Sequence, residues 1–292
     1  MSDAPDHQPA RDILQKLLVP RVSSAIVSQG HSAVEGPVVR ATDATPLGTP
    51  AALLAAYGFD GDDSPWGSAR PAHVDVLRFP VEPLMQLDVP QDVGERPWPT
   101  YPTGFLRGRV PVPVWLLQRT RVPVGTEFWR IKDTGEQRAL SVFAGPAIGW
   151  RGAQGYFPPL HLVGPRATWR GADHPAAFQP DGTGLELVTL TRDQVPEPFE
   201  QVRPGVWRAV LPVADCERVF EAVLTAEADG VPVRLLQRTS EESLVLLFDP
   251  DPQRVRRLEA REIEPGIFEA VVATDTLTKP SGVERELPVR SR

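Results

Sequence analysis

The chain has 292 residues, of which 31 are Lys or Arg and 38 are Asp or Glu, so its formal net charge is -7. Hydrophobic residues make up 41% of it, which argues against wholesale disorder, and no run approaches the roughly 18 consecutive apolar residues of a membrane span. The acidic balance argues against a general nucleic-acid-binding protein, which needs a basic face to neutralise phosphates.

The amino-acid usage also bears on cellular location. A single cysteine, Cys216, excludes a framework of intramolecular disulfides and a zinc site built from cysteines. The first ten residues are polar and are not followed by the apolar run of a secretory signal, so we predict a cytoplasmic protein, with export by a route that reads no such signal as the alternative. All basic residues except three lysines are arginines, which is typical of a GC-rich bacterial genome. Selection for bidentate binding of carboxylates or phosphates is the alternative explanation.

The first third of the chain predicts an arm, two helices and two strands. Residues 1–10 are expected to form a polar arm, and residues 11–18 a short amphipathic helix, because apolar residues recur in it at helical spacing. A second helix is predicted over 49–57, where Thr49 can cap the first turn and Pro50 occupies the favoured first position. Strands are expected over 73–79 and 83–90.

The middle of the chain has a strong β pattern. Three more strands are predicted at 112–120, 126–131 and 139–143, and five of the seven tryptophans fall in this central stretch. Prolines, 33 in all, occur throughout, so no long helix is expected. A proline-rich connection over 91–104 precedes these three strands.

The most informative feature is an internal repeat with an offset of about 60 residues. The stretch 168–178 is similar to 228–236, 184–190 to 243–249, and 202–210 to 263–271. Each copy predicts two strands, a connector and a Pro-Gly turn that begins a third strand. In the second copy the connector is expected to form a short helix capped by Asp251.

These patterns predict a mainly β (α+β) fold in which a mixed N-terminal domain is followed by two small β-rich modules. A nine-residue segment at 112–120 matches 231–239 in eight positions, so a degenerate earlier copy over 107–165 is a further hypothesis. The expected organisation is an arm and helix over 1–29, an N-terminal domain over 30–166, tandem modules over 167–226 and 227–278, and a polar tail over 279–292.

The sequence contains none of the common catalytic motifs, such as a nucleophile elbow, a Walker loop or a zinc-protease motif. Cys216 lies between two acids, which raise the pKa of a thiol, so we interpret it as a buried structural residue. The histidines are not spaced as a metal pair, and we predict neither a metal site nor a cofactor. The weak catalytic candidates are Glu127 and Arg130, on one strand, and His161, in an aromatic and proline-rich segment.

Aromatic residues are the candidates for binding. Trp98, Tyr101 and Phe105 cluster among prolines, where they could form a binding hot spot or fill the seam between domains. Trp150 and Tyr156, which follow the strand predicted at 139–143, are further candidates for binding.

Three hypotheses about function follow. The first is a non-catalytic bacterial protein that binds another protein, with immunity, antitoxin and accessory proteins as the type and a toxin or secreted effector as the partner. Nucleic acid and membrane are not expected as partners. The second is an enzyme acting on a nucleotide or sugar, of the NAD-processing type, with a site in residues 30–166. The third is a structural component of a bacterial or phage assembly.

Overall fold

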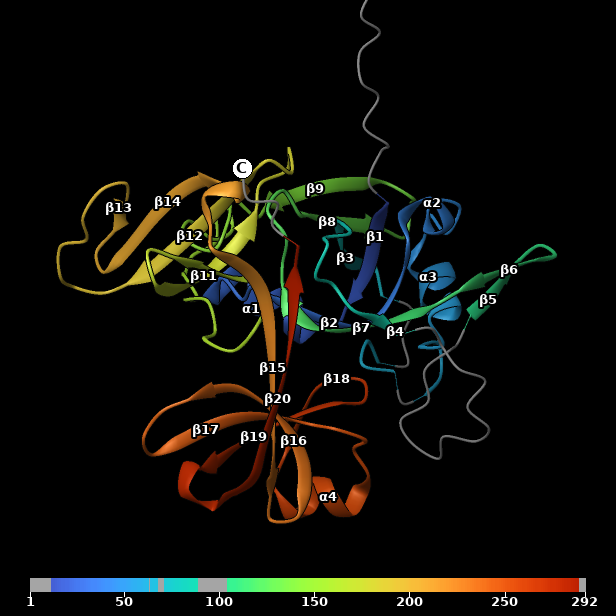
Figure 1. Ribbon diagram of the computed structural model, residues 1–292. Helices are drawn as coiled ribbons and strands as arrows, with labels where there is room; N and C mark the ends of the chain where they lie inside the picture. Colours follow the sequence, from blue (N-terminus) through green and yellow to red (C-terminus); the bar gives the residue numbers. More distant parts are fainter. Residues whose placement is uncertain (1–11, 63, 68–70, 89–103, 289–292) are drawn as a thin grey trace, which may run out of the picture.

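A computed structural model describes residues 12–62, 64–67, 71–88 and 104–288 (Figure 1). The predicted mainly β class is confirmed: strands make up about half of the chain, and the described residues form four short α-helices. Within the described ranges, no helix has both the length and the apolar character needed to cross a membrane.

The N-terminal half forms a seven-stranded antiparallel sheet in the order β4-β7-β2-β1-β3-β8-β9. Its strands are β1 (Ile13–Leu18), β2 (Ala33–Arg40), β3 (His73–Pro80), β4 (Leu87–Asp88), β7 (Trp115–Arg121), β8 (Glu127–Lys132) and β9 (Gln137–Val142). Helices α1 (Pro20–Gln29), α2 (Ala41–Ala44) and α3 (Pro50–Ala56) cover it, with apolar residues of α1 and of α3 in two separate core clusters. A separate hairpin of β5 (Gly104–Arg107) and β6 (Val110–Pro113) extends from this half (Figure 1).

Most of the local predictions for this half are confirmed. Helix α3 begins at Pro50, and the Thr49 hydroxyl accepts a hydrogen bond from the Ala52 amide at 3.4 Å. Strands β3, β8 and β9 lie where alternation predicts them. In the described part of the strand expected over 83–90, which ends at residue 88, only β4 is extended. The strand expected over 112–120 is split between β6 and β7.

The helix predicted over 11–18 is wrong, because Ile13–Leu18 form β1. This strand lies inside the sheet between β2 and β3, and both of its faces are covered. Leu14 and Leu18 pack into the cluster with α1, whereas Leu17 packs into the cluster with α3. Burial on both faces removes the alternation that identifies a half-buried strand, and the remaining spacing resembles that of a helix.

The C-terminal half forms an eleven-stranded sheet, β10 to β20. Its first strands are β10 (Arg166–Trp169), β11 (Ala172–Phe178), β12 (Gly184–Leu190), β13 (Glu200–Arg203) and β14 (Val206–Pro212). They are followed by β15 (Arg218–Ala228), β16 (Val231–Arg238), β17 (Glu242–Leu247), helix α4 (Pro252–Arg257), β18 (Arg261–Glu264), β19 (Ile267–Ala273) and β20 (Leu277–Leu287). We call β10–β14 the first module and β16–β19 with α4 the second module.

The two modules have the same succession of pairings. In the first module, a hairpin turn at Gly171 precedes β11, and β12 pairs with β14. In the second, a hairpin turn at Gly230 precedes β16, and β17 pairs with β19. The short strands β13 and β18 each contain a register shift just before their Pro-Gly turn. These registers place Arg203 opposite Val206 in the first module and Glu264 opposite Ile267 in the second. That the modules arose by duplication stays a prediction.

Several expected boundaries fall inside strands. The division at 226/227 lies within β15, which pairs with β10 through its first residues and with β16 through its last. Residues 279–287, expected in a polar tail, belong to β20 and pair along β15. Helix α4 is capped as predicted, because the Asp251 carboxylate accepts from the Gln253 and Arg254 amides at 2.7 and 2.9 Å. The stretch 107–165 supplies β6–β9 and does not follow the module order.

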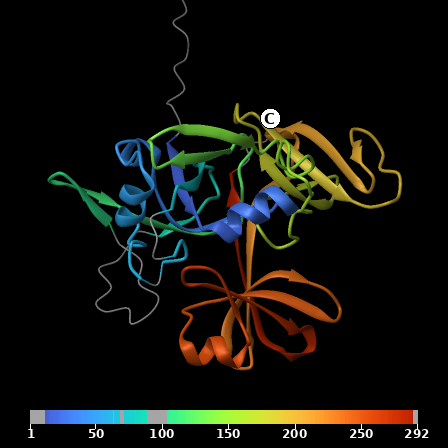
Figure 2. The ribbon, with the colours of Figure 1, turned by 180° about the vertical axis from the view of Figure 1, so that it is seen from behind.

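The second module is attached to the rest of the molecule in two ways. Strands β15 and β20 form a long ribbon that leads down to it (Figure 1). The second module also contacts the N-terminal half directly, since the Arg21 side chain of α1 donates to the Glu262 carbonyl at 2.9 Å. Figure 2 shows α1 above this module. This junction creates the cleft that is described in the next subsection.

Gly36 is required by the close approach at this junction. It lies at a register shift in β2 with φ +85, and a Cβ there would lie 3.0 Å from Ile267 Cδ1 and 3.4 Å from Lys16 Nζ. We expect Gly36→Ala to lower the free energy of unfolding by about 1–2 kcal/mol through backbone strain and by about 1 kcal/mol more through crowding. Urea denaturation measures the sum of these two losses.

Gly171→Ala is the matched control, because Gly171 has φ +74 and nothing within 4 Å of its Cβ position. It should show the backbone strain alone. Equal losses in the two variants would contradict the assigned crowding at the junction.

Candidate functional site: the junction cleft

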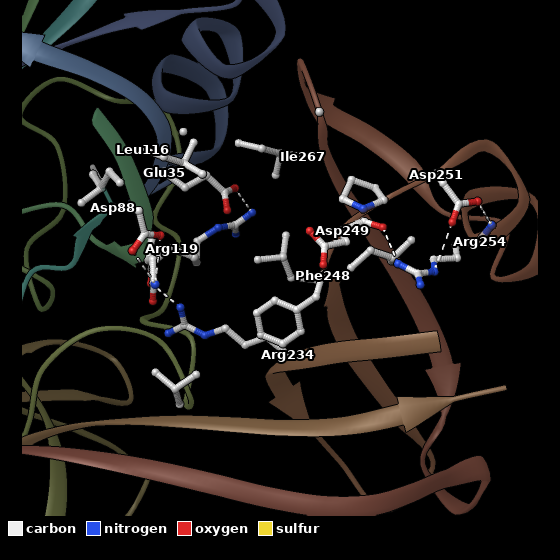
Figure 3. A pocket seen from close by; sticks show the side chains of 18 residues that line it. Glu35, Asp88, Leu116, Arg119, Arg234, Phe248, Asp249, Asp251, Arg254 and Ile267 are labelled. Carbon is white, nitrogen blue, oxygen red and sulfur yellow. Dashed lines mark hydrogen bonds and ion pairs between the residues drawn. The ribbon is translucent and has the colours of Figure 1, made fainter. Parts of the chain in front are cut away.

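A cleft of about 490 Å³ lies between the N-terminal sheet and the second module. We call it the junction cleft. One wall comes from β2, β4 and β7, and the other from β16, β17 and the segment that leads into α4 (Figure 3). The described residues that line it are Glu35, Gly36, Asp88, Leu116, Leu117, Gln118, Arg119, Val223, Arg234, Leu246, Leu247, Phe248, Asp249, Pro250, Asp251, Arg254, Gly266 and Ile267.

A buried ionic network joins the two walls. The guanidinium of Arg119, on β7, pairs with Glu35 of the N-terminal sheet and with Glu269 of the second module. Arg234 pairs with Glu221 at 3.3 Å and donates from Nη1 to the Arg119 carbonyl at 2.8 Å. Both arginine side chains are at most 3% exposed, so these contacts are shielded from water. Ionic contacts in such surroundings are strong only while every partner is present.

A second buried ion pair joins the two parts of the molecule. Lys16, on β1, pairs with Glu264, on β18, and also donates to the Leu17 carbonyl at 3.2 Å. Burial raises the pKa of Glu264, and Lys16 opposes that shift. Burial alone would lower the pKa of Arg119, but Glu35 and Glu269 outweigh it and raise the pKa.

The two nearly identical sequence segments meet at this junction. Segment 112–120 supplies Arg119, and segment 231–239 supplies Arg234, which occupies the single position where the two differ. The contact between Arg234 and the Arg119 carbonyl therefore joins the two copies of one motif. The sequence similarity was a signal for this site, but it gave no indication that the segments face each other.

The mouth of the cleft is acidic and apolar. The cleft has three arginines, and each is paired with a carboxylate of the chain, Arg254 with Asp251 at 3.1 Å. Asp88 accepts only from the Gln118 amide at 3.2 and 3.4 Å, and neither Asp88 nor Asp249 has a cationic partner in the described part of the chain. Figure 3 shows these two carboxylates on opposite walls. Beside Asp249 lies Phe248, which is 39% exposed.

The structure does not bring the three catalytic candidates together. Glu127 accepts from the Trp129 indole at 2.8 Å, whereas Arg130 projects from the other face of β8 and pairs with Asp75 at 2.8 Å. His161 lines a different hollow, of about 520 Å³, formed by the 157–161 loop and strands β11 and β12. Burial, followed by the charge of Arg166, lowers the pKa of His161. These residues cannot form one catalytic site in this arrangement.

The remaining chemical candidates are accounted for by packing. Cys216 is buried, as predicted, and burial followed by its acidic neighbours raises its pKa. Among the described residues, no group of three His, Cys, Asp or Glu side chains is placed to hold a metal ion.

Three of the five aromatic binding candidates lie in the part of the chain that the structure describes. Trp98 and Tyr101 lie outside the described residues. Phe105 packs against the cluster beneath α3, and the buried Trp150 donates from its indole to the His31 carbonyl at 2.8 Å. Tyr156 donates to the Pro146 carbonyl at 2.8 Å, and the guanidinium of Arg203, in the first module, lies over its ring. Phe105, Trp150 and Tyr156 therefore make contacts within the protein.

The two modules hold their neighbours through the same face. In the second, Ile267, Glu264 and Glu269 meet the N-terminal sheet. In the first module, Val206 occupies the position that corresponds to Ile267, and it packs on Ala147. Arg203 corresponds to Glu264 by register, and it donates to the Ile148 carbonyl at 2.6 Å and lies 3.8 Å over the Tyr156 ring. Opposite charges at corresponding positions thus face different partners.

Comparisons of the chain with models of protein families, with curated proteins and with solved structures found no match.

Proposed function

We propose that this protein acts without catalysis by binding another protein, and that it is of the immunity or antitoxin type. The observation that carries the proposal is the junction cleft, where Asp88 and Asp249 face the opening without a cation and Phe248 offers apolar surface. A basic surface of a toxin or effector would complement these groups, and the net charge of -7 would accelerate the encounter.

The chemistry of the lining supports binding. The described residues that line the cleft include no hydroxyl, thiol, imidazole or lysine side chain, so a nucleophile of any of these four kinds is missing among them. The three arginines are held by carboxylates of the chain itself, so none of the described lining residues offers a free cationic group to an anionic substrate.

The construction of the modules supports the same function. Each already attaches a neighbouring part of the chain through one face, by a buried aliphatic residue and charged residues beside it. A fold built from units that dock in this way can extend the same kind of contact to a second protein.

The test is binding to the proteins encoded next to this one in its genome. Each would be purified and titrated calorimetrically with the full chain, and tested for toxicity with and without it. We expect one basic protein to bind, more weakly as salt rises, and its toxicity to be suppressed. If none of them binds and no toxicity is relieved, the proposal is refuted.

A further inference from the structure

The junction cleft has features that specify what kind of group it binds. It is lined by both parts of the molecule, and its two walls are fixed relative to each other by the buried network of Arg119, Glu35 and Glu269. Because this network is at most 16% exposed, its carboxylates are unavailable to a ligand. A ligand therefore meets the groups at the mouth.

Two carboxylates remain for the ligand, Asp88 from the N-terminal sheet and Asp249 from the second module. They lie on opposite walls (Figure 3), and the Asp249 main chain is fixed because its carbonyl accepts from Arg254 Nη1 at 2.7 Å. A planar guanidinium has five donors and can bond to two carboxylates at once, which the compact ammonium of lysine does less well. The adjacent ring of Phe248 offers a face on which a guanidinium can stack.

The walls near the two carboxylates offer apolar surface as well. Leu116, from the N-terminal sheet, and Ile267, from the second module, both line the cleft. They can contact apolar side chains that flank a bound guanidinium.

We infer that the junction cleft binds an extended segment of a partner protein through an arginine flanked by apolar residues. The guanidinium pairs with Asp88 and Asp249, and the flanking apolar side chains contact Leu116 and Ile267. This inference rests on the proposed function, and it adds the chemical identity of the recognised group.

The test uses the full chain and three short peptides, in which a leucine-flanked central residue is arginine, lysine or citrulline. Calorimetric titration should show binding of the arginine peptide and a loss of at least about tenfold for citrulline, which keeps the shape but lacks the charge. Asp88→Asn/Asp249→Asn should lose affinity by a similar factor. Asp193→Asn, an exposed carboxylate of the first module, should change nothing.

Two results would overturn the inference: equal binding of the arginine and citrulline peptides, or no binding of any peptide at millimolar concentration. Folding of the double variant would be checked by its unfolding midpoint, and citrulline gives the same information without altering the protein. If a partner protein binds the double variant as tightly as the natural chain, the protein-binding function stands and this site is wrong. If no partner binds while the arginine peptide does, the proposed function fails and the site stands.

Discussion

Lys16→Met should destabilise the protein by about 3–5 kcal/mol, because it leaves the Glu264 carboxylate buried without its counter-charge. Methionine fills nearly the same volume, so the loss reports charge and not a cavity. Lys16→Met/Glu264→Met should recover most of the stability, since an apolar pair of similar size replaces a buried ion pair at little cost. Thermal and urea unfolding of both variants measure these effects.

The loss in Lys16→Met should also depend on pH. Burial raises the pKa of Glu264, and without Lys16 the neutral form is favoured further. The single variant should therefore be least stable relative to the natural chain at neutral pH, and the difference should shrink as Glu264 takes up a proton in acid. Lys132→Met is the control, because Lys132 pairs with Glu136 in solvent and should contribute at most about 1 kcal/mol. A double variant as unstable as the single one would contradict this account.

Acidification from pH 7 to pH 4 should lower the free energy of unfolding by up to about 3 kcal/mol through His31 alone. Its pKa falls from 6.5 to about 4 in the folded protein, first because it is buried and second because Arg119 lies nearby. The unfolded chain takes up a proton below pH 6.5 and the folded chain does not, so stability falls through this window and levels off below about pH 4. His31→Gln should remove this part of the pH dependence.

The control for His31 is His73, which is exposed at the start of β3. His73→Gln shows the effect of the same replacement at an exposed position. The buried carboxylates Glu186, Glu221 and Glu264 have raised pKa values, so their contributions run in the opposite direction and decline as pH rises. Comparison of each variant with the natural chain at every pH isolates the histidine. Parallel profiles for His31→Gln and the natural chain would refute the assigned shift.

Both predictions concern the junction on which the proposed function depends. The junction cleft exists only while the second module stays against the N-terminal sheet, and the pairs Lys16–Glu264 and Arg119–Glu269 both cross that boundary. Variants that weaken these pairs should therefore reduce partner binding as well as stability. Asp88 and Asp249 lie at the mouth, outside the network, so their variants separate recognition from assembly.

Local elements with one dominant signal could be read from the sequence. Helices α3 and α4 follow from their caps, Thr49 and Asp251, because capping depends on only a few neighbouring residues. Strands such as β3 and β8 follow from alternation, which records that their two faces differ in burial. Strand β1 was misread because coverage of both its faces is a property of its place in the sheet.

Composition, alternation and capping residues were enough to predict the mainly β character, the alternating strands and the short capped helices. They carried no information on how distant segments pack: that 112–120 and 231–239 meet, that Glu127, Arg130 and His161 lie apart, and that Asp88 and Asp249 line one cleft. Local patterns depend on neighbours a few residues apart. A junction such as Lys16 with Glu264 joins residues 248 positions apart, and the burial that makes their charges matter is created by the packing itself.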